Sequence, residues 1–115
     1  MKRLLLVLLW PCAALALTPE AQEFIDLSAR LEPVQCEKRK LRRAIVLAEV
    51  ERRDADLKAM RARFAEINAD PETARLESRL AVLSARVLDG QGRPRNAEDL
   101  DAISLQQRQA FYRCE

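Results

Sequence analysis

Residues 34–67 have the sequence VQCEKRKLRRAIVLAEVERRDADLKAMRARFAEI, and this stretch decides the fold. It contains no Gly or Pro and is rich in Ala, Leu, Arg, Lys and Glu, which are strong helix formers. Its apolar residues recur at spacings of three, four and seven, a pattern typical of a helix with one buried face. The sequence therefore predicts one long helix whose apolar stripe packs internally. A stripe that forms a cofactor box or a partner groove is the alternative.

A shorter helix is expected before the long one. Residues 18–20, Thr-Pro-Glu, combine an N-cap, a proline at the first helical position and an acid in the first turn. We expect this helix to run from Pro19 to about Leu31. The following pair, Glu32-Pro33, predicts a bend or a fresh start, because the residue before a proline avoids helical geometry.

Two further helices are expected after the long one. Asp70-Pro71 is typical of a helix start and predicts a third helix that ends near Leu88. Residues 89–95 contain both glycines of the chain and form its only flexible loop of any length. Asn96 is expected to cap a fourth helix, supported by acids in the first turn, Glu98 and Asp99. That helix is expected to turn Leu100, Ile103, Ala110 and Phe111 inward.

Residues 1–16 have the features of a secretory signal peptide. Two basic residues precede a short apolar run, and residues 14–16, Ala-Leu-Ala, are suitable for signal peptidase, so cleavage is expected between Ala16 and Leu17. The apolar run is shorter than the roughly 18 residues that a membrane-spanning helix requires. Acylation of Cys12, as in a lipoprotein, is the alternative, but the bulky Trp10 and Pro11 precede this cysteine.

Export has consequences for the rest of the chain. We expect residues 17–115 to form a single helical domain in the periplasm of a Gram-negative bacterium, without stable membrane insertion after cleavage. Only Cys36 and Cys114 remain in that domain, and an even count in an oxidising compartment predicts one disulfide between them. A redox pair or a metal clip is the alternative, but no CxxC spacing occurs.

Helix lengths suggest how the two cysteines meet. At 1.5 Å per residue, the long helix spans about 50 Å, and the third and fourth helices span about 27 Å and 24 Å. Laid end to end, the last two helices return the chain to the start of the long one. The sequence therefore predicts an all-α fold, an antiparallel helical hairpin with a broken return arm plus a short N-terminal helix, closed by one disulfide. A three-helix bundle is the alternative, and it brings the cysteines together only if the last helix runs the same way.

Charge and composition exclude several functions. The chain has 20 Lys and Arg against 18 Asp and Glu, and loss of Lys2 and Arg3 leaves 18 of each sign. This neutral balance does not favour nucleic acid or an anionic membrane as a partner. The basic run at residues 38–43 could bind an anion, or it could form a solvated helix face. With no His and no glycine-rich phosphate loop, we expect a non-enzymatic protein without metal or cofactor.

One stretch is similar to a known motif. Residues 103–107, Ile-Ser-Leu-Gln-Gln, with residues 17–20 upstream, resemble the LTxxQ motif of the Spy/CpxP family of small periplasmic helical chaperones. At the first site the glutamine is displaced by one residue, to Gln22. The resemblance implies a chaperone or envelope-stress scaffold that holds unfolded chains in a hairpin cradle.

We expect instead a protein-binding module that inhibits or adapts another envelope protein. Its contacts are expected near the disulfide and the loop at residues 90–95. A dimer is compatible with the sequence.

Overall fold

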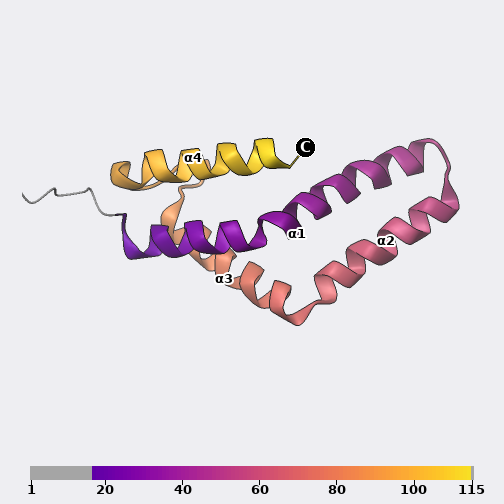
Figure 1. The fold of residues 1–115 in the computed structure, drawn as a ribbon, viewed down its shortest axis with the longest axis horizontal. Coiled ribbons are helices and arrows are strands. Elements are labelled where there is room, and N and C mark those ends of the chain that lie inside the picture. The colour runs from indigo at the N-terminus through magenta and orange to yellow at the C-terminus, as the bar shows by residue number, and fades with distance from the viewer. Residues whose placement is uncertain (1–16, 115) are drawn as a thin grey trace, which may run out of the picture.

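A computed structural model describes residues 17–114, and over that range the protein consists of four α-helices (Figure 1). These are α1 (Pro19–Val50), α2 (Asp54–Ala69), α3 (Pro71–Val87) and α4 (Ala97–Arg113). The predicted all-α class is confirmed. The signal peptide and the Ala16 side of its cleavage site lie outside the described residues.

α1 continues through Pro33, so the predicted short N-terminal helix is wrong, and of the two outcomes predicted at Glu32-Pro33, a bend or a fresh start, the fresh start does not occur. An internal proline removes one backbone hydrogen bond and can bend a helix without ending it. Figure 1 shows that α1 changes direction along its length. The buried Leu31 precedes the proline and the disulfide-bonded Cys36 follows it, so both flanks of Pro33 are held by tertiary contacts.

The predicted long helix over residues 34–67 is also wrong, because a sharp turn centred on Arg52 divides it. Arg52 is in the left-handed conformation, with φ of 54°, and its amide donates to the Glu49 carbonyl. The Arg53 amide donates to the Ala48 carbonyl. This pattern is a Schellman motif, which commonly ends a helix with glycine at the left-handed position. Because this position holds arginine instead of glycine, the sequence gives no signal of the turn.

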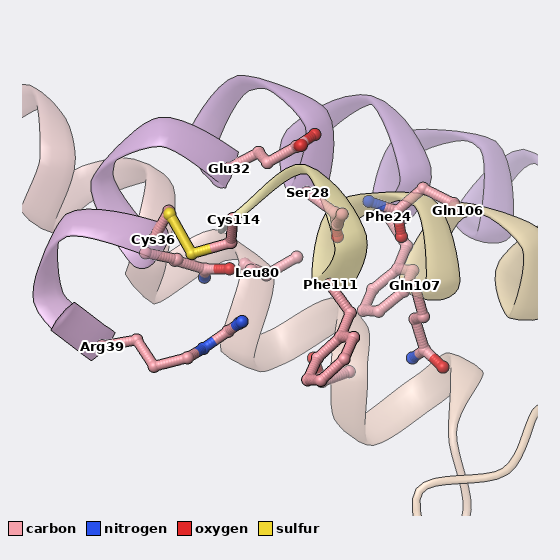
Figure 2. Close-up of a pocket in the computed structure, with 13 residues that line it drawn as sticks. Phe24, Ser28, Glu32, Cys36, Arg39, Leu80, Gln106, Gln107, Phe111 and Cys114 are labelled. Carbon is pink, nitrogen blue, oxygen red and sulfur yellow. A yellow bond between two sulfur atoms is a disulfide. The ribbon is translucent and has the colours of Figure 1, made fainter. Parts of the chain in front are cut away.

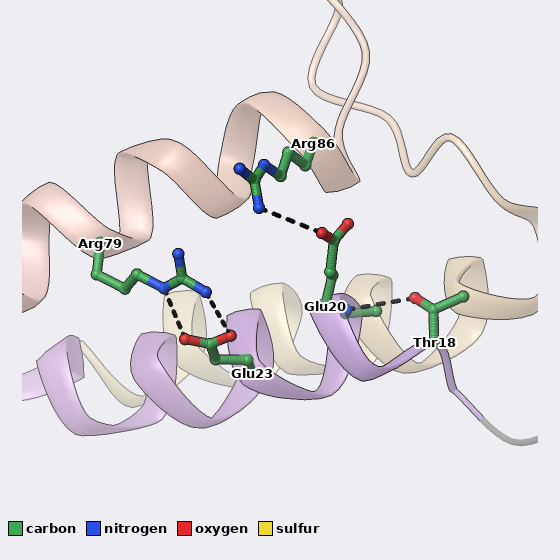
Figure 3. Close-up of polar contacts among 6 residues, drawn as sticks. Thr18, Glu20, Glu23, Arg79 and Arg86 are labelled. Atoms are coloured by element: carbon green, nitrogen blue, oxygen red, sulfur yellow. Dashed lines mark hydrogen bonds and ion pairs between the residues drawn. The ribbon is translucent and has the colours of Figure 1, made fainter.

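The turn makes α2 and α3 together the return arm of an antiparallel hairpin with α1 (Figure 1). α1 has 32 residues and the two return helices have 16 and 17, so each arm is about 50 Å long. Ion pairs show that the return arm is antiparallel to α1. As the residue number of the α1 partner rises, the residue number of its partner on the return arm falls. The pairs are Glu20–Arg86, Glu23–Arg79, Arg30–Glu72, Glu37–Arg63 and Glu49–Arg61, of which Figure 3 shows the first two. The molecule is therefore a hairpin whose return arm is broken at Asp70.

The predicted placement of the last helix at the end of the return arm is wrong. α4 instead lies beside the N-terminal half of α1 and runs in the same direction (Figure 1). Three contacts join partners at a nearly constant separation of 81, 81 and 78 residues, as parallel helices require. They are Thr18–Asp99, Glu32–Arg113 and the Cys36–Cys114 disulfide. The predicted disulfide is confirmed, but the parallel direction of α4 brings its cysteines together.

The apolar core lies in one part of the molecule, which we call the head and define as residues 17–37 and 70–114. Its buried core residues are Ala21, Phe24, Leu27, Leu31, Leu76, Leu83, Val87 and Ile103. We call the remaining two-helix part, residues 38–69, the arm. It contains the C-terminal part of α1 and all of α2, and it is distinct from the return arm of the hairpin, which consists of α2 and α3. Only three residues of the arm are buried, Lys38, Ala48 and Ile67. The head is thus a three-helix unit, and the arm is a projection of α1 and α2.

Candidate functional site

A buried carboxylate fixes the first turn of α4 to the start of α1. Asp99 is 2% exposed, and its two oxygens accept hydrogen bonds from the Thr18 amide at 3.1 Å and the Thr18 hydroxyl at 2.9 Å. The Thr18 hydroxyl also accepts a bond from the Ala21 amide and so caps α1, as its position in the sequence predicts (Figure 3). Sequence reasoning identified Asp99 only as a first-turn acid, because nothing local indicates a partner 81 residues away.

The disulfide fixes the other end of α4. The Cα atoms of Cys36 and Cys114 are 5.4 Å apart, within the usual range for a disulfide. Beside them, the Arg113 guanidinium donates two hydrogen bonds, of 2.9 Å and 3.2 Å, to the Glu32 carboxylate. The 17 residues of α4, about 25 Å of helix, are therefore anchored at both ends. An element held in this way can present side chains in a fixed arrangement.

A groove lies between α3 and α4, with α1 as its floor (Figure 2). It encloses a cavity of about 300 Å³ next to the disulfide. Its lining includes Phe24 and Ser28 from α1, Leu80 and Ser84 from α3, and Gln107 and Phe111 from α4. Ring and aliphatic surfaces therefore lie beside hydroxyl and amide groups, and the charged Glu32 and Arg39 also line the groove. A carboxamide can both donate and accept hydrogen bonds, so this lining suits the backbone of a peptide.

Two residues of α4 that were expected to be buried, Leu100 and Phe111, are exposed to solvent instead. Phe111 is 61% exposed at the edge of the groove, and Leu100 is also exposed, so both predictions are wrong. α4 buries one stripe against the core through Ile103, and the flank that carries Leu100 and Phe111 is left uncovered. The Phe111 and Tyr112 rings pack edge to face, with centroids 5.5 Å apart. The C-terminal turn of α4 thus displays two adjacent exposed aromatic rings.

A second recess, of about 600 Å³, lies on the other side of the disulfide. Its walls carry charged groups from Glu32, Glu37, Lys40 and Arg113. The acids among them are paired within the protein, and the Arg63 guanidinium beside Glu37 holds the pKa of that carboxyl below its ordinary value. Three of these four groups are already paired, and only Lys40 has no ion-pair partner among residues 17–114, so the recess offers a ligand one free charge.

The loop at residues 90–95 does not join the disulfide in one site. It precedes α4, whereas the disulfide closes the far end of that helix (Figure 1). The loop is a hydrogen-bonded turn in which the Asp89 carboxylate accepts from the amides of Gln91 and Arg93, and these bonds lower the pKa of Asp89. The structure thus places the two regions at which contacts were expected at opposite ends of α4.

The basic run at residues 38–43 is divided by its burial. Lys38 is buried, donates to Glu77 at 3.0 Å and lies over the Phe64 ring at 5.6 Å from its centroid. Arg42 lies over the same ring. Lys38 therefore ties α1 to α3 and α2 instead of belonging to a solvated face.

No protein-family model, curated protein or solved structure matches this chain. The resemblance of residues 103–107 to the LTxxQ motif therefore gains no support from these comparisons. Within residues 17–114, no group of three or more His, Cys, Asp or Glu is placed to hold a metal ion. None of the described helices is long and apolar enough to cross a membrane.

Proposed function

We propose that the protein is a non-enzymatic protein-binding module of the bacterial periplasm, an inhibitor or adaptor that captures a segment of another envelope protein. The supporting observation is the groove beside the disulfide, bordered by the exposed ring of Phe111. Exposed aromatic residues beside a pocket are typical of interface hot spots, because they bury a large apolar area with little loss of conformational freedom. The anchored ends of α4 favour binding further, since a preorganised surface loses less entropy on association.

The groove suits an extended or helical peptide segment. Amide and hydroxyl groups from Gln107, Ser28 and Ser84 can pair with main-chain groups, while Phe24 and Leu80 offer apolar surface to a side chain. A cavity of about 300 Å³ matches the lower end of the range for small-ligand pockets, enough for one or two side chains. We therefore expect one anchoring residue of the partner to insert beside Phe111.

The chaperone alternative calls for a wide, continuous apolar face. The exposed large apolar residues instead fall into separate groups. One lies at the end of α1, comprising Val46, Leu47 and Val50, a second is Val82 on α3, and a third lies on α4, comprising Leu100, Leu105, Phe111 and Tyr112. This distribution favours a compact epitope over a cradle for unfolded chains.

Capture from periplasmic extract with two matched variants tests the proposal. Phe111→Ala removes the ring at the groove, whereas Leu105→Ala removes a similarly exposed side chain, 57% against 61%, outside the groove lining. We expect the unaltered protein and Leu105→Ala to retain one stoichiometric partner. Phe111→Ala should lose at least tenfold in affinity, because a hot-spot residue contributes about 2 kcal/mol or more.

Two results would count against this function. Equal retention by both variants would remove the groove from the binding surface. A broad set of substoichiometric proteins, held by both variants, would support the Spy/CpxP-like chaperone reading instead.

A further inference from the structure

The neutral balance of charge conceals a division between the two parts of the molecule. The arm, residues 38–69, contains ten Lys and Arg against five Asp and Glu. The rest of residues 17–115 contains eight against thirteen. The arm is thus basic and the head acidic, and the two cancel in the composition. A local excess of positive charge attracts an anionic ligand whatever the net charge of the chain.

Much of the unpaired positive charge lies on one face of α1. A helix turns about 100° per residue, which places six residues within one sector of about 120° whose centre is about 140° around the helix from the buried Ala48. We call this the arm face, and it consists of Arg39, Lys40, Arg43, Val46, Leu47 and Val50. All six side chains are exposed, and no acid lies among them. Among residues 17–114, the three cations of this face have no ion-pair partner.

The apolar half of the arm face lies next to the hairpin turn. Val50 is 76% exposed, and Val46 and Leu47 are each more than half exposed. A single exposed aliphatic residue is ordinary, but these three are adjacent on one helix face and follow three cations. Three of the four acids nearest the turn are paired, Glu51 and Asp56 with Arg53 and Glu49 with Arg61, which leaves Asp54 as the unpaired acid there among residues 17–114. The arm thus ends in an aliphatic tip bordered by free positive charge.

We propose that the arm face docks on an anionic membrane surface. A helix that binds at the membrane interface carries cations, which contact the lipid headgroups, beside exposed apolar side chains, which contact the acyl chains. Arg39, Lys40 and Arg43 would contact lipid phosphates, and the three aliphatic residues would enter the outer acyl region. Single-stranded nucleic acid favours aromatic side chains for base stacking, and the arm face has none. The proposal rests on the arm face and not on the groove, and the two surfaces share only Arg39.

Vesicle binding by the full chain purified after export tests this inference. The vesicles contain phosphatidylglycerol and phosphatidylcholine in equal amounts, with pure phosphatidylcholine as the neutral reference. Lys40→Gln/Arg43→Gln, which leaves the groove lining unchanged, is compared with Arg93→Gln/Arg108→Gln, which removes the same charge from exposed positions in the head. Only differences between variants are interpreted, so any contribution of residues 1–16 cancels.

We expect the unaltered protein to bind the anionic vesicles and to be released by salt. The arm variant should partition about thirtyfold more weakly, because each cation near the surface contributes about 1 kcal/mol, while the head variant should change little. Leu47→Ser should also weaken binding, whereas Leu105→Ser on α4 should not. Circular dichroism checks that each variant remains helical.

Three results would overturn the inference. The unaltered protein could fail to bind anionic vesicles, or the arm and head variants could lose affinity equally. A third is binding to single-stranded DNA or to a second copy of the chain that depends on Lys40 and Arg43, with no binding to vesicles. That result would identify a different occupant of the arm face.

Discussion

Removal of the Cys36–Cys114 disulfide is expected to lower the free energy of unfolding substantially. The bond joins residues 78 apart, for which the chain-entropy model gives about 4.5 kcal/mol at 25 °C. The closed loop contains the second half of α1 and all of α2, α3 and α4, so the bond restricts most of the unfolded chain. We expect a measured loss of about 2 to 5 kcal/mol, a large share of the stability of a domain this small.

The structure also predicts which part of the molecule loses most stability when the disulfide is removed. Without the disulfide, the first turn of α4 is still held by Asp99 and the buried Ile103. Its last turns retain only the exposed Arg113–Glu32 pair, which contributes about 0 to 1 kcal/mol. The C-terminal half of α4 should therefore open locally before the rest of the head unfolds.

Urea unfolding and amide hydrogen exchange of Cys36→Ser/Cys114→Ser test both parts. Exchange should accelerate most in the second half of α4 and least in α3. Unaltered protein reduced with dithiothreitol is the control, and it should behave like the double variant. A loss below about 1 kcal/mol, with α4 as well protected as α3, would refute the reasoning. Two free thiols in protein from an oxidising compartment would refute it as well.

Three further outcomes are expected. Asp99→Ala should lower the free energy of unfolding by about 3 kcal/mol in urea titration, because two hydrogen bonds to a buried carboxylate are lost, and adding Thr18→Val should cost only about 1 kcal/mol more, for the lost cap of α1. Arg52→Gly should raise it by up to about 1 kcal/mol, since glycine adopts φ of 54° without steric cost, and an unchanged or lower midpoint would contradict the turn geometry. The Thr73 amide lowers the pKa of Asp70, so the stability from this cap is present above about pH 4 and lost as the pH falls through the lowered pKa. Asp70→Asn keeps a capping oxygen but should flatten that part of the pH dependence of the unfolding free energy, and an unchanged slope would show that the acid loss arises elsewhere.

Part of the candidate site could be predicted and part could not. The pairing of Cys36 with Cys114 followed from counting, since only two cysteines remain in the expected mature chain. The groove beside that bond had no sequence signal, because it exists only where α3 and α4 flank α1. Phe111 shows the limit most clearly. Its helical spacing is compatible with the core, but α4 has one neighbouring helix on that stretch and leaves the ring at the surface.

Local patterns were sufficient for the all-helical composition and for the caps at Thr18 and Asp70, because each depends on groups within three residues of one another. The turn at Arg52, the passage of α1 through Pro33 and the direction of α4 were decided only in three dimensions. A segment rich in Ala, Arg and Glu has nearly the same helix propensity whether it forms one continuous helix or two helices joined by a turn. Packing and contacts with distant residues therefore decide between the two. The excess of positive charge in residues 38–69 is already present in the sequence, and the tertiary structure decides only that this stretch projects from an acidic head.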